Sequence, residues 1–253
     1  MKKYQPTLEI ACGSAWDAIE AAAGGADRVE FCSAMFLGGL TPSYGSFVTA
    51  RRDCRIPMYV MLRPREASFA YNDYEYNVIK EDAKIFLEAG AEGLVLGLLT
   101  PDNDLDLERL KDFRETFPDA ELVFHRAFDI VNDWRSAMES LIELGFKRIL
   151  SSGQAPNVII GKEKLKSMNE AAQGRIEIMP GGGLKPFFLA ELLEYTGVSS
   201  VHMNLRRPVR DASGDMTNGI HFGGALYPAE NLYDVIDSEK VRQISSGEIF
   251  KTN

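Results

Sequence analysis

Eight short apolar runs alternate with eight helix-length segments from one end of the chain to the other, and this pattern constrains the fold more than any other feature. Apolar runs of this length, bounded by glycine and polar residues, are typical of strands buried on both faces. Strands that alternate with helices form parallel sheets, because parallel neighbours need a crossover connection. Eight even units predict a single α/β domain folded as a closed (β/α)8 TIM barrel. The alternative, an open doubly wound sheet, needs a reversal of strand order that nothing in the pattern indicates.

The predicted elements cover most of the chain. Strands are expected at residues 8–12, 28–32, 58–63, 93–98, 121–125, 148–152, 175–179 and 199–203. Helices are expected at 15–23, 44–52, 73–89, 106–116, 134–144, 163–172, 186–195 and 230–246. No linker divides the sequence, so residues 1–253 are predicted to form one domain. The one long irregular segment, 205–229, precedes the last helix and is interpreted either as a lid over the strand ends or as a plain surface loop.

Charge and hydropathy restrict the partners of the chain. Asp and Glu number 37 against 28 Lys and Arg, which gives a formal net charge of −9. A protein that binds a nucleic acid duplex needs a local excess of basic residues, so a nucleic acid partner is not expected, whereas a small anionic ligand is not excluded. No apolar stretch is as long as that of a signal peptide or a membrane span, so no membrane partner is expected. The three cysteines form no Cys-x-x-Cys pair, which favours reduced thiols in the cytoplasm.

Ionisable side chains recur in the otherwise apolar strands and at their C-terminal ends. The candidates are Glu9, Glu30, His125 and His202 as general acids or bases, and Arg63, Arg65 and Arg126 as binding residues for an anionic substrate. In a TIM barrel the site is formed by inward residues at the C-terminal strand ends and by the loops that follow. Charged groups in apolar strands are costly to bury without partners. They are interpreted as an anion or carbonyl site with acid–base groups, as a Glu/His metal site, or as a structural network of salt bridges.

Three consecutive glycines, Gly181, Gly182 and Gly183, follow the seventh predicted strand. Their backbone N–H groups can surround a phosphate or carboxylate, a use that is common after strand 7 of this fold. The alternative interpretation is a tight strand-to-helix turn, for which glycine is equally suited.

Cys32 has the same strand parity as Glu30, so its side chain is expected to point inward at the barrel mouth. A thiol there is a candidate Cu(I) ligand or nucleophile. Buried cysteine is, however, more often inert packing. Cys12 is out of phase with Glu9 and is expected to face the helices, and Cys54 is expected to pack at a helix end.

Several segments together resemble the CutC family, which is named for copper homeostasis. The matching segments are GGADRVEFCSA (24–34), GGLTPSYG (38–45), PMYVMLRPR (57–65), LGLLTPDNDLD (96–106), VFHRAFD (123–129), RILSSGQ (148–154) and IMPGGG (178–183). The resemblance extends from about residue 8 to residue 204. It implies a cytoplasmic TIM barrel that binds Cu(I), with a role in copper trafficking or tolerance.

The resemblance also implies where copper would bind. The ligands suggested for the family are cysteines near the ends of strands 1 and 2, and the second of them corresponds to Cys32 in this chain. The first position is occupied by Ala11, while Cys12 lies one place later, on the opposite face of the strand. A copper site here would depend on Cys32 with help from His or Met, and His202 is the candidate helper.

Two main functions remain side by side at this point, beside a plainer third one, a barrel that serves as a binding scaffold without turnover, and whether the chain is an enzyme is left open. The first is a copper homeostasis protein that binds or transfers Cu(I) in the cytoplasm. The alternative is a TIM-barrel isomerase, epimerase or lyase that acts on a small anionic sugar-like or carbonyl metabolite. The expected partner is therefore a copper ion or a small anionic metabolite. No organic cofactor is indicated, and a homodimer is the default among oligomers.

Overall fold

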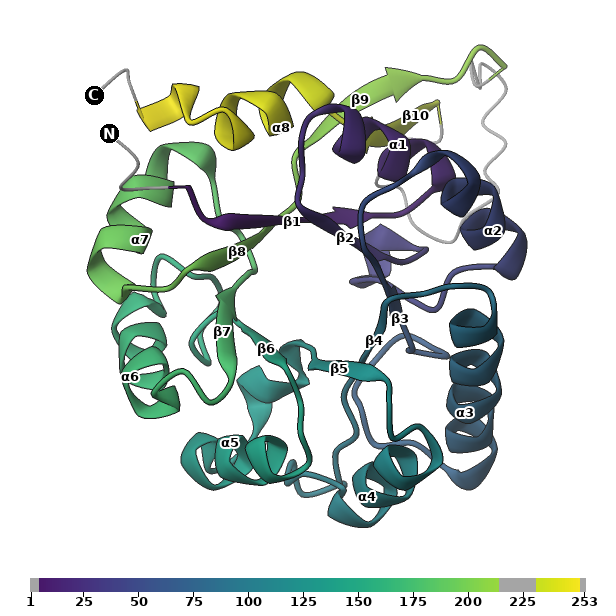
Figure 1. Cartoon of the computed structure of the whole chain (residues 1–253), viewed down its shortest axis with the longest axis vertical. Coiled ribbons are helices and arrows are strands. Elements are labelled where there is room, and N and C mark those ends of the chain that lie inside the picture. Colours follow the sequence, from purple (N-terminus) through teal and green to yellow (C-terminus); the bar gives the residue numbers. More distant parts are fainter. Residues whose placement is uncertain (1–4, 214–230, 251–253) are drawn as a thin grey trace.

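A computed structural model describes residues 5–213 and 231–250. At its centre, parallel strands curl into a barrel in the order β7-β6-β5-β4-β3-β2-β1-β8 (Figure 1). The strands are β1 (Thr7–Cys12), β2 (Arg28–Phe31), β3 (Met58–Met61), β4 (Gly93–Leu96), β5 (Glu121–Phe124), β6 (Arg148–Ser151), β7 (Glu177–Pro180) and β8 (Ser200–Met203). The first strand pairs with both β2 and β8, so the chain returns to its starting point. The predicted (β/α)8 TIM barrel is confirmed.

Helices surround this barrel as an outer layer (Figure 1). They are α1 (Ala15–Ala23), α2 (Tyr44–Asp53), α3 (Asp73–Glu88), α4 (Leu107–Thr116), α5 (Trp134–Glu143), α6 (Lys162–Ala172), α7 (Leu189–Thr196) and α8 (Ser238–Ser245). Short 3-10 turns lie at η1 (Met35–Leu37), η2 (Arg126–Ile130), η3 (Pro186–Phe188) and η4 (Glu248–Phe250). Side-chain caps fix several helix starts: Asn72 and Glu75 form a reciprocal capping box at the start of α3. Among the described residues, no helix is both long enough and apolar enough to cross a membrane.

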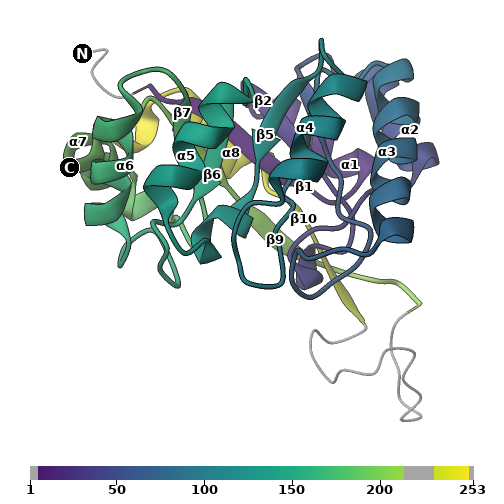
Figure 2. The same cartoon turned by 90° about the horizontal axis from the view of Figure 1, so that it is seen from below.

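The end of the chain differs from the prediction. Instead of a helix from residue 230, β10 (Leu232–Ile236) pairs antiparallel with β9 (Arg206–Arg210), and α8 begins only at Ser238. The side chain of Asp237 accepts a hydrogen bond from the Lys240 N–H and caps this shorter helix. The start of the segment predicted to be irregular is therefore one strand of a hairpin, and the start of the predicted last helix is the other; the two strands lie at one end of the barrel (Figure 2). Residues 214–230, which include most of the predicted lid or loop, lie outside the described residues.

Two apolar cores lie on the two faces of the barrel strands. The outer core packs the strands against the helices and includes Cys12 and Cys54. The inner core fills the barrel with Cys32, Tyr59, Met61, Val95 and Val123. Strand alternation thus places Cys12 toward the helices and Cys32 inside the barrel, as expected from their parity.

Charged residues from the N-terminal halves of the strands close the barrel beside this inner core. Arg28 lies between two carboxylates, with Nε 2.7 Å from Glu9 Oε2 and Nη2 2.7 Å from Glu177 Oε1. The guanidinium of Arg148 lies 4.1 Å from the centre of the Tyr59 ring. At this depth the barrel contains a salt-bridge network of Glu9, Arg28 and Glu177.

Candidate functional site

A cavity of about 440 Å³ lies at the C-terminal ends of the barrel strands. Its walls come from the last residues of the strands and from the loops that follow them. The lining includes these residues predicted from the sequence: Glu30, Arg63, His125, Arg126, Gly182, Gly183 and His202. The fold therefore brings most of the predicted site residues to one place.

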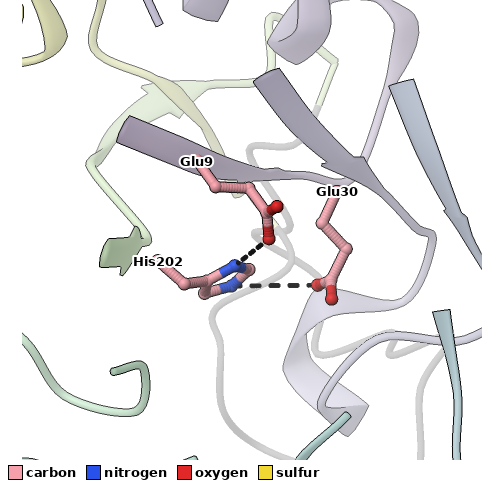
Figure 3. A group of neighbouring side chains, drawn as sticks. All are labelled: Glu9, Glu30 and His202. Atoms are coloured by element: carbon pink, nitrogen blue, oxygen red, sulfur yellow. Dashed lines mark hydrogen bonds and ion pairs between the residues drawn. The ribbon is translucent and has the colours of Figure 1, made fainter. Parts of the chain in front are cut away.

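The imidazole of His202 lies between two carboxylates from neighbouring strands (Figure 3). Its Nδ1 is 2.8 Å from Oε1 of Glu9, and its Nε2 is 3.8 Å from Oε2 of Glu30. The contact with Glu9 follows from the pairing of β1 with β8, whose register sets Glu9 opposite His202. Gly181 makes room for Leu150 and for this histidine, because a Cβ at that position would lie 2.5 Å from Cδ1 of Leu150 and 3.3 Å from the ring atom Cδ2 of His202.

Burial and charge move the protonation equilibria of these residues in different directions. Burial alone would raise the pKa of Glu9, but His202 and Arg28 outweigh burial and lower it to about 2. Burial raises the pKa of Glu30, and the charge of His202 offsets only part of that effect. For His202, burial lowers the pKa, yet Glu30 and Glu9 together bring it above its ordinary value. These shifts keep Glu9 anionic, favour the protonated form of His202 beside it, and favour the neutral form of Glu30 more than usual for a carboxyl group.

Glu9 does not belong to the cavity wall. Both of its oxygens are engaged, Oε1 by His202 and Oε2 by Arg28, and its side chain is 2% exposed. A carboxylate held in this way is suited to orienting His202 and stabilising its positive charge. It is poorly suited to the role of base that the sequence suggested as one option.

His125 and Arg63 form another part of the cavity wall. Nδ1 of His125 accepts a hydrogen bond from the Ala127 N–H at 3.1 Å, which leaves the ring hydrogen on Nε2. Burial and the nearby charge of Arg63 lower the pKa of His125 to about 3. His125 is therefore neutral near pH 7 and suited to donating a hydrogen bond to a ligand oxygen, rather than to acting as a cationic acid.

The position of His125 depends on a glycine to which the sequence analysis gave no role. A Cβ added to Gly97 would lie 2.3 Å from Cε1 of His125 and 2.5 Å from its Nδ1. Only glycine leaves space for the imidazole at this point.

Only some of the remaining predicted binding residues line the cavity. Arg65 lies outside the cavity lining and is held by Glu75 at the start of α3. Arg126 lines the cavity but is paired with Asp129 at 2.8 Å. The N–H of Gly181 donates to Ser151 O within the sheet, whereas Gly182 and Gly183 adopt positive φ values of 102° and 77° and reach the lining. The glycine run thus serves both as a turn and as part of the cavity wall.

Cys32 does not belong to the cavity lining, although it follows Glu30 by two residues and packs beside Gly39. Its thiol is buried and donates a hydrogen bond to Oε2 of Glu30 at 3.4 Å. Burial and the adjacent Glu30 raise the pKa of the thiol well above its ordinary value. The inward orientation agrees with the strand parity, but the free thiol is protonated at neutral pH.

Sequence reasoning missed several lining residues. They are Met35, Leu37, Met61, Phe69, Leu150, Leu184, Lys185 and Asn204. Strand parity contained a signal for some of these, since Met61 is two residues before Arg63 and Asn204 is two residues after His202. Met35 and Phe69 lie beyond the barrel strands, where no periodicity indicates direction.

Comparisons with known proteins agree on one family. The model of the CutC family matches residues 6–206. A CutC family protein from Treponema denticola is 39% identical over 94% of this chain and 96% of its own length. The human copper homeostasis protein cutC homolog is 38% identical over 94% of this chain and 88% of its own length. A crystal structure of CutC from Streptococcus agalactiae superimposes with a TM-score of 0.74 at 34% identity, covering 78% of this chain and 97% of that one.

Proposed function

Because this chain belongs to the CutC family, we propose that it takes part in copper homeostasis by binding Cu(I) inside the barrel near the C-terminal strand ends, with Cys32 and His202 as ligands. Relatives that are named for copper homeostasis support the role. One observation carries the proposed site: Sγ of Cys32 and Nε2 of His202 approach the same oxygen, Oε2 of Glu30, at 3.4 Å and 3.8 Å. The role requires a reduced thiol, so we place it in the cytoplasm, where thiols stay reduced.

The donors around Cys32 suit Cu(I). This ion prefers thiolate, thioether and imidazole ligands over carboxylates. Met61 packs with Cys32 in the inner core, and Met35 packs against the same cluster, which supplies two thioethers close to the thiol.

A second donor set is less suitable. Ligand atoms of Glu9, Glu30 and His202 lie within 4.8 Å of one another, an arrangement that could in principle hold a harder cation. Glu9, however, already uses one oxygen for Arg28 and the other for His202. A cation bound by all three residues would have to disrupt the buried salt bridge, so we favour the soft donors.

Copper binding would displace the proton of the Cys32 thiol, because the thiolate is the form that binds metal, and any proton on Nε2 of His202, because only the unprotonated nitrogen can be a ligand. The thiol already donates its hydrogen to Glu30, through which the proton can pass on to solvent. We therefore expect Cu(I) affinity to rise with pH, since each binding event releases a proton.

The test is an anaerobic competition titration with Cu(I) on the wild type, Cys32→Ala and Cys12→Ala. Cys12 is the matched control, because it is also a buried cysteine at a strand end but lies in the outer core. We expect stoichiometric Cu(I) binding by the wild type and Cys12→Ala, and a large loss of affinity in Cys32→Ala. Unchanged binding by Cys32→Ala would contradict the proposed ligand, and weak binding by the wild type would contradict a role based on copper.

A further inference from the structure

Three polar atoms of the cavity-lining residues have no hydrogen-bond partner in the described part of the chain. They are Nε of Arg63, Nε2 of His125 and Oε1 of Glu30, and each is buried. Buried donors and acceptors in native proteins nearly always have partners, so three unpartnered atoms around one cavity point to a ligand that supplies them. A copper ion cannot do so, because two of these atoms are N–H donors.

Arg63 indicates which charge the ligand carries. Its guanidinium donates from Nη1 to the carbonyl oxygens of Leu37 and Gly39, and from Nη2 to that of Ala67. Among the described residues no carboxylate forms an ion pair with it, although Arg63 is only 7% exposed. A buried cation held by neutral carbonyl groups retains its full charge and favours an anion next to it.

His125 lies beside Arg63 and supplies a second donor. The Phe69 ring contacts both residues, with its centre 4.8 Å from the imidazole centre and 5.3 Å from Cζ of Arg63. Because Nδ1 accepts from the Ala127 N–H, the Nε2–H of His125 is the hydrogen that needs an acceptor. Glu30 provides the complementary group, an oxygen that needs a donor such as a hydroxyl.

We propose that the cavity binds a small hydroxylated organic oxyanion, a carboxylate or a phosphate ester. Its anionic oxygen pairs with Arg63, a neighbouring oxygen accepts the hydrogen of His125 Nε2, and a hydroxyl group donates to Oε1 of Glu30. The cavity volume of about 440 Å³ is within the range of small-molecule sites and far exceeds what a single metal ion needs. This site is distinct from the copper proposal, because Cys32 does not line the cavity, but the two sites adjoin at Glu30 and His202.

The experiment is calorimetric titration of metal-free protein, with a chelator present, using glycerate, glycerol 3-phosphate and neutral glycerol. We expect at least one anion to bind and glycerol not to bind, and the preferred anion identifies carboxylate or phosphate as the recognised group. Arg63→Met should weaken this binding about ten- to hundredfold, because a hydrogen bond to a charged group is lost. Arg65→Met is the matched control: this neighbouring arginine is paired with Glu75 outside the cavity, and its loss should leave binding unchanged.

His125→Phe is a second test that keeps an aromatic ring and removes the donor. This variant should weaken the binding of the same anion, and it can be measured even if Arg63→Met fails to fold. The proposal is overturned if neither anion binds the wild type, if glycerol binds as well as the anions, or if Arg65→Met loses as much affinity as Arg63→Met. A Cys32→Ala variant that still binds the anion separates this result from the copper titration.

Discussion

Acidification should destabilise the protein in part through the imidazole of His125. Burial lowers its pKa in the folded state from 6.5 to about 3. The unfolded chain therefore takes up this proton first, so the stabilising contribution is present above pH 6.5 and is lost as the pH falls toward 3. At about pH 4.5 the loss amounts to about 2.7 kcal/mol, because each pH unit below the unfolded pKa is worth about 1.36 kcal/mol.

The measurement is urea unfolding of the wild type and His125→Gln at about pH 7 and about pH 4.5. Glutamine retains hydrogen-bonding groups but does not titrate, and the contributions of the other acids and bases cancel in the comparison. Between the two pH values, the free energy of unfolding of the variant should fall by about 2.7 kcal/mol less than that of the wild type. Equal losses in the two proteins would refute the conclusion that the native imidazole stays neutral.

Other variants test the packing, the buried charges and the copper site. Gly97→Ala should cost about 1–3 kcal/mol of stability, because its Cβ would overlap the buried imidazole beside it. By contrast Gly45→Ala, in helix α2 with open space around it, should raise the free energy of unfolding by about 0.5–1 kcal/mol. Urea unfolding measures both variants. A Gly97→Ala protein more stable than the wild type would contradict the packing argument. Arg28→Met should cost about 3–5 kcal/mol because it leaves the buried carboxylate of Glu9 without this cation. Arg175→Met, which breaks an exposed pair, should change stability little in the same assay. Ala11→Cys should tighten Cu(I) binding in the competition titration, because it adds a thiol at the cavity wall; unchanged affinity would place the copper site elsewhere.

The fold and most of the cavity lining could be predicted because both depend on short-range periodicity. Eight strand–helix units predict a barrel, and the two-residue period within each strand then selects the inward side chains. That argument was sufficient to bring Glu30, Arg63, His125 and His202 to one end of the barrel. It also separated Cys12 from Cys32 correctly, since one residue of displacement changes the face of the strand.

The same two-residue period gives wrong predictions beyond the end of a strand, and it does not predict how deep in the barrel a side chain lies. Arg65 follows Arg63 by two residues, but β3 ends at Met61 and the chain beyond it no longer alternates. Glu9 faces inward as predicted, yet it lies one layer below the cavity, because depth depends on the stagger between strands and not on the pattern within one strand. The β9–β10 hairpin pairs residues 206–210 with residues 232–236. Local sequence patterns do not predict a pairing between segments so far apart in the sequence.

Glu30 connects the two proposed ligand sites. Its Oε2 faces the thiol of Cys32 and the imidazole of His202, while its Oε1 lacks a partner and belongs to a residue of the cavity wall. Copper that replaces the thiol proton would alter the hydrogen bonding and charge at Oε2, and a hydroxylated anion would engage Oε1 of the same carboxyl group. A group shared in this way makes the two affinities depend on each other, and thermodynamic linkage requires the effect of copper on anion binding to equal that of the anion on copper binding. In the charged layer beneath, Arg28 holds Glu9 and Glu9 holds His202, so a change at Glu30 would be felt against a fixed imidazole.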